Sequence, residues 1–295
     1  MSRIRADALL LLTALIWGSA FIAQKTVHGA MGPLAFVGGR FLIAAVVIAP
    51  LAWGEARSRP AALDRSSWGL AALCGACLLI GSYLQQAGMS TASATHAGFL
   101  TALYVVLVPF IVWALTRRAP RAAIFLASAV SVLGAWLLTG AGGLGELSFG
   151  DVEVAVADFA WALGIALTPT FLRRAPRPFL LCFTQNLATG VIALGASALW
   201  ETSSWAGLNA ALPSLLYAGL LSSGVGFTLQ VVAQEHAPPA EAALILSLEA
   251  VFAAIAGACL LGERLTLVAA SGCVLILLGV VLVEIGPALS RRVRA

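Results

Sequence analysis

SLEAVFAAIAGACLLGERLTL, residues 247–267, is the stretch that decides the fold of this chain. It contains an apolar helical run with a single acid, Glu249, and ends in the turn Gly262-Glu263-Arg264. A second apolar run then begins at Leu265 and continues to Val283. A helix that crosses a lipid bilayer needs about 20 apolar residues. The stretch therefore predicts two membrane-spanning helices joined as a tight antiparallel hairpin.

The stretch has a counterpart earlier in the chain. Sliding the sequence by 145 residues places Gly81 on Gly226 and Gln85 on Gln230, with no gap between them. An offset of 144 places Trp17 on Trp161. Matching helix boundaries in one register indicate a duplicated gene, with a first repeat at 1–143 and a second at 144–295. The Gly-rich segment 140–150 forms the expected connection.

The composition is that of a polytopic membrane protein. The chain has 295 residues, of which 61% are hydrophobic and 10% charged, with a mean hydropathy of +0.98. A soluble domain carries about 25% charged residues. The net charge of +4 comes from short Arg clusters between apolar runs, which is typical of topology signals rather than of a nucleic-acid surface. The pair Cys74 and Cys77 lies inside an apolar run, which favours helix packing over metal binding.

Ten apolar runs predict an all-α fold with ten transmembrane helices. They span 7–25, 33–53, 67–87, 93–115, 121–139, 151–172, 178–199, 209–232, 239–261 and 266–285. Placing the N-terminus inside puts 14 of the 17 Lys and Arg residues on the cytoplasmic side, so both termini are predicted to be cytoplasmic. Five spans per repeat is an odd number, so the second repeat must be inverted relative to the first.

The motifs resemble those of the EamA family in the drug/metabolite transporter superfamily. They are Ile16-Trp17-Gly18-Ser19-Ala20-Phe21, Gly39-Arg40-Phe41, and Leu248-Glu249 through Gly262-Glu263-Arg264-Leu265-Thr266. The resemblance covers nearly the whole chain and implies two inverted five-helix repeats around a central cavity that works by alternating access. Two positions differ from the family pattern: Ala250 follows Glu249 where the family often has Pro, and Thr116-Arg117-Arg118 lacks the Gly-Glu of the second hairpin. Within the family, the chain is most similar to YddG-type exporters of aromatic amino acids.

Such a substrate requires flat apolar surfaces and a few orienting polar groups. The candidates for the cavity wall are Trp17, Tyr83, Gln85, His96, Phe99, Tyr104, Trp161 and Gln230. Trp17 and Trp161 lie about 15 Å into their spans at the helical rise of 1.5 Å per residue, near the midplane. The alternative is that these side chains only pack between helices or face lipid.

Ionisable groups inside a membrane are costly and are therefore functional candidates. Asp158 and Glu249 are the candidates for binding a proton or a substrate ammonium. Asp158 could instead face a hydrated vestibule, and Glu249 could be a structural acid bonded to a neighbouring helix. Arg40 favours a structural role over binding a substrate carboxylate.

Glycine and proline mark the positions where helices can bend or approach closely. These are Gly81, Pro109, Pro169, Gly224 and Gly226. His96 and His236 lack a second ligand at metal spacing, so the sequence predicts no metal site and no cofactor.

These features favour a secondary transporter of the bacterial inner membrane for aromatic amino acids or similar amphipathic metabolites, and the family resemblance implies that it exports them. The partners we expect are a small-molecule substrate and the lipid bilayer, with no nucleic acid, and a monomer suffices to complete the cavity. Export of other metabolites or of cationic drugs is the alternative on the same fold. An intramembrane enzyme is disfavoured because the sequence contains no GxSxG or HExxH motif. The sequence also contains no P-loop, so transport is expected to be gradient-driven or facilitated.

Overall fold

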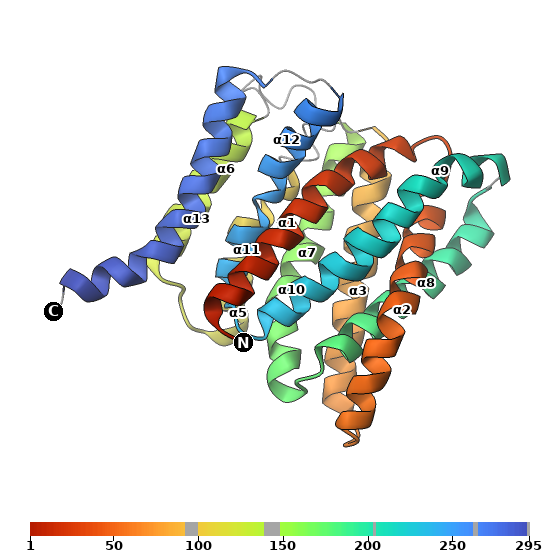
Figure 1. The fold of residues 1–295 in the computed structure, drawn as a ribbon, viewed down its shortest axis with the longest axis horizontal. Helices are drawn as coiled ribbons and strands as arrows, with labels where there is room; N and C mark the ends of the chain where they lie inside the picture. The colour runs from red at the N-terminus through yellow and green to blue at the C-terminus, as the bar shows by residue number, and fades with distance from the viewer. Residues whose placement is uncertain (92–99, 139–147, 203–204, 262–264, 294–295) are drawn as a thin grey trace.

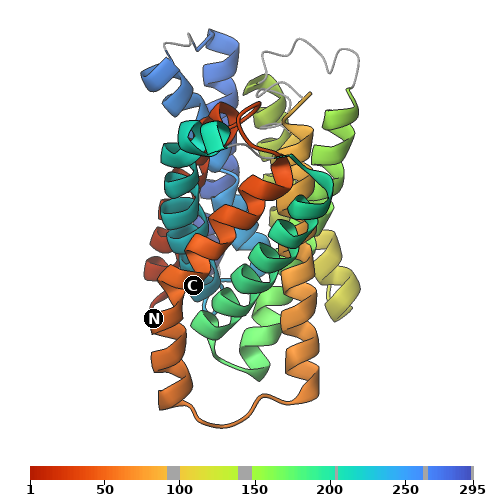
Figure 2. The same cartoon turned by 90° about the vertical axis from the view of Figure 1, so that its right-hand side faces the viewer.

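The computed structural model describes residues 1–91, 100–138, 148–202, 205–261 and 265–293, and these form an all-helical bundle (Figure 1). Most of the helices extend along the long direction of the bundle, several of them inclined to one another, and the connection at residues 59–64 lies at one end (Figure 2). The elements are α1 (Arg3–Thr26), α2 (Pro33–Ser58), α3 (Arg65–Gly88), α5 (Tyr104–Thr116), α6 (Ala122–Leu138), α7 (Phe149–Arg174), α8 (Pro178–Trp200), α9 (Trp205–Tyr217), the π-helix η1 (Ala218–Gly226), α10 (Phe227–Gln234), α11 (Pro239–Leu246), α12 (Glu249–Leu261) and α13 (Leu267–Val293).

Seven helical segments in the described part of the chain are long and apolar enough to cross a membrane. Three shorter apolar helices accompany them, at Tyr104–Thr116, Ala122–Leu138 and Leu267–Val283. Large apolar side chains are exposed around the bundle, among them Trp53, Leu199 and Trp200. A soluble monomer does not expose apolar surface on this scale, so the exterior is suited to lipid and the chain is a multi-pass membrane protein.

Helices far apart in the sequence form the most extensive contacts. The pairs are α2 with α8, α6 with α13, α3 with α7, and α1 with α12. The predicted hairpin of the last two spans is wrong in one respect: α13 packs along α6 rather than on α12, as Figure 1 shows. Gly134 on α6 faces the backbone of Gly272 on α13, which lets the two helices approach closely.

Two helices break at corresponding positions near the middle of the bundle. The segment predicted as one span at 93–115 turns at Ala102 and Leu103, and α5 begins at Tyr104. The ninth predicted span turns at Ser247 and Leu248, between α11 and α12. The same short hydrogen bonds form at both turns: Val105 N–H donates to Ala102 O at 3.3 Å, and Ala250 N–H to Ser247 O at 3.2 Å. Each break leaves the N-terminus of a half-helix in the protein interior.

The eighth predicted span contains nine residues of π-helix, η1, between α9 and α10. Its sequence, AGLLSSGVG, is rich in small residues that weaken the α-helical preference and let neighbours approach. A π-helix has i→i+5 backbone hydrogen bonds in place of the α-helical i→i+4 bonds, and short π-helical segments occur frequently at functional sites.

A reciprocal pair of carboxylates joins α2 to α8 at both ends of these antiparallel helices. Glu201, just after α8, accepts hydrogen bonds from the N–H groups of Leu34 and Ala35 at 2.8 Å each, at the start of α2. Glu55, near the end of α2, accepts from Leu180 N–H at 2.8 Å, at the start of α8. Each acid satisfies free donors and meets the positive end of the helix dipole.

Asp64 caps α3 in a different way, outside the apolar segments. Its carboxylate accepts hydrogen bonds from Ser67 N–H at 3.0 Å and from Ser66 Oγ at 2.7 Å. These bonds, with Ser67 contributing most, lower the pKa of Asp64 to about 2. The cap therefore stays charged at physiological pH.

Candidate functional site

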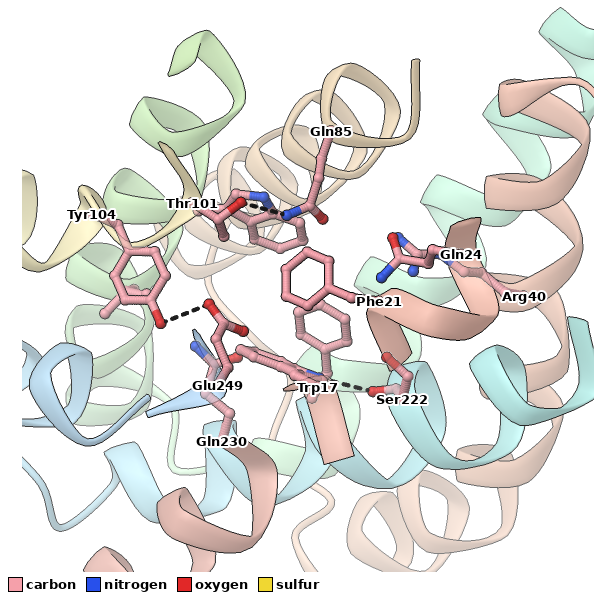
Figure 3. A pocket seen from close by; sticks show the side chains of 13 residues that line it. Trp17, Phe21, Gln24, Arg40, Gln85, Thr101, Tyr104, Ser222, Gln230 and Glu249 are labelled. Atoms are coloured by element: carbon pink, nitrogen blue, oxygen red, sulfur yellow. Dashed lines mark hydrogen bonds between the residues drawn. The ribbon is translucent and has the colours of Figure 1, made fainter. Parts of the chain in front are cut away.

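A cavity of about 50 Å³ lies between the broken helices and η1. At about 10–15 Å³ per water in the same measure, it has room for a few water molecules. Figure 3 shows the side chains that surround it. The lining residues are Trp17, Phe21, Gln24, Arg40, Gln85, Thr101, Tyr104, Trp161, Ile165, Ser222, Phe227, Gln230 and Glu249.

Aromatic rings form the middle of the cavity wall, and Phe227 contacts three others. Its ring is stacked on Trp161, with centroids 5.6 Å apart and planes at 17°. Its centroid lies 4.7 Å from that of Trp17 and 5.8 Å from that of Phe41, with the rings tilted. Such rings provide flat apolar surfaces for a ligand, at separations typical of favourable aromatic pairs.

Each cavity tryptophan packs against a glycine contributed by the other half of the sequence. A Cβ added at Gly226 would lie 2.6 Å from Trp17 Nε1, and one added at Gly81 would lie 3.0 Å from Trp161 Cε2. The indole N–H of Trp17 donates to Ser222 O in η1 at 3.1 Å. The indole N–H of Trp161 is buried without a hydrogen-bond partner.

A tyrosine and an acid join the two half-helices at one end of the cavity. Tyr104 Oη donates to Glu249 Oε1 at 3.0 Å, across 145 residues of sequence, and both residues are the first of their half-helix (Figure 3). The buried carboxyl of Asp158 faces the Tyr104 backbone N–H and Glu249. Neither of its oxygens is in a hydrogen bond of standard geometry. Two buried carboxyls thus lie close together, at the positive ends of two helix dipoles.

Amides and hydroxyls complete the polar lining. Gln85 Nε2 donates to Thr101 Oγ1 at 3.2 Å, and Gln230 Nε2 donates to Gln234 Oε1 at 3.2 Å. Gln234 Nε2 in turn donates to Ile165 O at 3.0 Å. These hydrogen bonds fix the side-chain amides, which leaves their remaining donor and acceptor positions for a ligand.

The structure brings five of the eight predicted wall residues together, since the cavity is lined by Trp17, Gln85, Tyr104, Trp161 and Gln230. Glu249 of the acid pair lines it as well. Two predicted wall residues, His96 and Phe99, lie outside the described residues. Tyr83 does not line this cavity, because it lies two residues before Gln85 and so points to the opposite face of α3.

Two of the five positions predicted for bends and close packing lie against cavity tryptophans. Gly81 and Gly226 are the two glycines under the tryptophans, and Gly224 lies in η1. Pro109 lies inside α5 and Pro169 inside α7.

Several lining residues were not singled out from the sequence. Phe21 and Gln24 follow Trp17 by four and seven residues, so they lie on the same face of α1 and could have been found by helical spacing. Phe227, Thr101 and Ser222 carried no such signal. The sequence favours a structural role for Arg40, and the structure places this residue in the cavity wall.

Within the described part of the chain, no three His, Cys, Asp or Glu side chains are grouped as metal ligands. Cys74 and Cys77 are free thiols in a buried cluster with Phe171 and Leu181.

The apolar exterior, the membrane-length helices and the cavity between them define a polytopic membrane protein. The model of the EamA-like transporter family matches residues 4–140 and again residues 148–285. The chain belongs to this family and is therefore a membrane transporter by descent.

Two of the similar proteins are named as transporters. An uncharacterized transporter of Archaeoglobus fulgidus is 30% identical over 285 residues, covering 97% of this chain and 87% of the relative. An uncharacterized transporter of Bacillus subtilis is 24% identical and covers 94% of this chain and 93% of its own length. A WAT1-related protein of Arabidopsis thaliana is 25% identical over 89% of this chain and 79% of its own. A solved crystal structure matches all of both chains with a TM-score of 0.80 at 18% identity, which shows the shared fold.

Proposed function

We propose that this protein is a secondary transporter that exports aromatic amino acids or similar small amphipathic metabolites across the bacterial inner membrane. The proposal rests on one observation above all: Trp17, Phe21, Trp161 and Phe227 surround a cavity whose two ends are polar. Aromatic walls hold an apolar ring, and a few convergent polar groups fix its orientation.

Transport requires the cavity to enlarge and to open to one side at a time. Its present 50 Å³ is too small for an aromatic amino acid. Ion pairs close the end of the bundle where the N-terminus lies: Arg3 binds Glu241 of α11 at 2.9 Å, and Arg121 binds Glu241 at 3.3 Å (Figure 1). These partly exposed pairs can separate at modest cost, which is what alternating access demands.

The proposed architecture has ten transmembrane helices in two inverted repeats, at 1–143 and 144–295, with both termini in the cytoplasm. The paired helix breaks at Ala102 and Ser247 support this arrangement. A monomer encloses the whole cavity, so one chain is proposed to be the functional unit, embedded in lipid and acting on its substrate without catalysis.

Export of cationic drugs or of other metabolites is the second candidate. The observation that favours cations is the buried pair of carboxyls, Asp158 and Glu249, which could bind an organic cation in place of a proton. In the leading proposal the same pair binds the coupling proton or the substrate ammonium.

Efflux from proteoliposomes tests the proposal. Labelled phenylalanine, tryptophan and threonine are loaded, with and without an imposed pH gradient. We expect preferential efflux of the two aromatic amino acids, lost in Trp17→Ala and Trp161→Ala. Trp53→Ala is the matched control, since Trp53 is 63% exposed on the bundle exterior.

The imposed pH gradient then tests whether the buried carboxyls of Asp158 and Glu249 couple proton movement to transport. Acceleration by the gradient in the wild type, abolished in Asp158→Asn or Glu249→Gln, would assign proton coupling to these carboxyls. Absence of efflux for every amino acid would reject the proposed substrates, and efflux of a fluorescent organic cation would then support the second candidate.

A further inference from the structure

Arg40 is a buried cation in the wall of the cavity. Arg40 is only 2% exposed and lies seven residues after the start of α2. At 1.5 Å per residue this is about 10 Å from the helix start, well inside the membrane. Burying a guanidinium without a countercharge is costly, so such a group has a functional or structural reason to be there.

No acid among the described residues forms a salt bridge with Arg40, and its Nε–H is without a hydrogen-bond partner. Other arginines in the structure are better satisfied: Arg3 and Arg121 bind Glu241, and Arg177 donates to two backbone carbonyls. The charge of Arg40 thus faces the cavity without an anion.

Aromatic contacts account for only part of the arginine's surroundings. Its guanidinium carbon lies 4.8 Å from the ring centroid of Phe41 and 5.7 Å from that of Phe36. Such cation–π contacts hold the planar group in place but do not satisfy its in-plane N–H donors. They leave a positioned fork of donors at the cavity wall.

Gln24 lies beside Arg40 at the same end of the cavity, opposite the Tyr104–Glu249 pair, with the aromatic rings between the two ends (Figure 3). Gln86 Nε2 donates to the backbone carbonyl of Gln24 at 3.3 Å, which fixes this part of α1. The side-chain Oε1 of Gln24 is buried and has no partner.

We propose that Arg40 and Gln24 form an anion subsite that binds the carboxylate of the transported molecule. The guanidinium fork matches a carboxylate with two parallel hydrogen bonds, and the amide N–H₂ of Gln24 supplies a third donor. The aromatic rings then hold the apolar body of the ligand. This inference deepens the proposed function by making a carboxylate obligatory in the substrate, and it excludes simple organic cations.

Ligand binding to the purified full chain in detergent tests the subsite without requiring transport. The probes are 3-phenylpropionate, an aromatic carboxylate without an amine, and phenethylamine, the corresponding amine without a carboxylate. We expect 3-phenylpropionate to bind and to raise the melting temperature of the wild type, and phenethylamine to have no such effect. Arg40→Gln should weaken 3-phenylpropionate binding by about tenfold to a hundredfold, as expected for lost hydrogen bonds to a charged group.

Two controls separate the subsite from nonspecific charge and from folding. Arg57→Gln removes the same charge from an exposed position on the same helix, where Arg57 contacts Trp53, and should bind 3-phenylpropionate like the wild type. Gln24→Leu keeps the arginine and should weaken binding less than Arg40→Gln does. If Arg40→Gln does not fold, the wild-type preference for the carboxylate and the Gln24→Leu effect still decide the matter.

The outcomes distinguish this inference from the proposed function. Unchanged binding in Arg40→Gln, or equal binding of the amine in the wild type, overturns the anion subsite even if aromatic amino acids are exported. Arg40-dependent binding of 3-phenylpropionate by a protein that exports no amino acid supports the subsite and rejects the proposed substrates. Absence of any carboxylate binding in the wild type overturns the subsite.

Discussion

Trp17 on Gly226 and Trp161 on Gly81 are two versions of one contact, and they differ in the helix beneath the indole ring. Gly226 ends the π-helix η1, and the carbonyl of Ser222 accepts the indole N–H of Trp17 at 3.1 Å. Gly81 lies in the regular α-helix α3, and the indole N–H of Trp161 has no partner.

The π-helix explains the difference. In α3, the backbone follows the regular α-helical pattern, and no carbonyl accepts a hydrogen bond from the indole N–H of Trp161. In η1, the backbone bonds follow the i→i+5 pattern, and the Ser222 carbonyl also accepts the indole N–H of Trp17. One tryptophan is therefore anchored to its neighbour, while the other presents an unused donor next to the cavity. We expect the anchored contact to carry more of the stability and the unanchored one to be freer to serve a ligand.

The largest effect is expected from Gly18, next to the anchored tryptophan. A Cβ at this position would lie 2.5 Å from the backbone oxygen of Glu249 and 2.7 Å from Phe252 Cβ, so α1 and α12 would have to separate. The offset of 144 residues that aligns Trp17 with Trp161 aligns Gly18 with Ala162, which already carries a Cβ. Gly18→Ala should destabilise the protein by about 3 kcal/mol, measured by unfolding in mixed detergent micelles. Gly195→Ala, where nothing lies within 4 Å, is the control and should be neutral or slightly stabilising.

Adding a methyl group beneath each tryptophan tests the comparison directly. The new Cβ at Gly226 would meet Trp17 Nε1 at 2.6 Å and disturb its bond to Ser222, whereas at Gly81 the closest atom is at 3.0 Å. Gly226→Ala should therefore cost about 2 kcal/mol, and Gly81→Ala about 1 kcal/mol. The same unfolding measurement checks both, and equal costs would contradict the asymmetry.

Replacing each indole with phenyl isolates the hydrogen bond. Both Trp17→Phe and Trp161→Phe remove similar volume, but only the first leaves a carbonyl, that of Ser222, without its donor. Trp17→Phe should be the more destabilising by about 1 kcal/mol. Binding of an aromatic ligand provides the second measurement, and a larger loss in Trp161→Phe would fit its unused donor.

The reciprocal caps provide a smaller and more even comparison. Glu201 accepts two backbone N–H bonds and one from Ser197 Oγ at 2.9 Å, and Glu55 accepts the N–H of Leu180. Glu201→Ala and Glu55→Ala should each cost about 1 kcal/mol, with Glu201 slightly the larger. The caps lie at opposite ends of α2, so the double variant should show additive losses in unfolding experiments. A strongly non-additive result would indicate that α2 and α8 move as one coupled unit.

Local sequence determined the class of the protein and many of the residues that line the cavity. Apolar runs of membrane length, Arg clusters between them and the 145-residue offset predicted the multi-pass helical fold, because lipid imposes length and hydrophobicity on each helix separately. Trp17, Gln85, Tyr104, Trp161, Gln230 and Glu249 could be selected because apolar surroundings make polar and aromatic side chains conspicuous.

Tertiary structure alone decided how these residues meet. The pairing of Tyr104 with Glu249, the π-helix that accepts Trp17, and the packing of α13 along α6 depend on contacts between segments far apart in the chain. Arg40 shows the limit most clearly, since its position in the sequence favours a structural cation over a carboxylate-binding one. Only the packed neighbours of α2 reveal that no acid in the described chain neutralises it and that its charge faces the cavity. A pattern in sequence specifies which face of a helix is polar, whereas the partner of that face is set by how the helices pack.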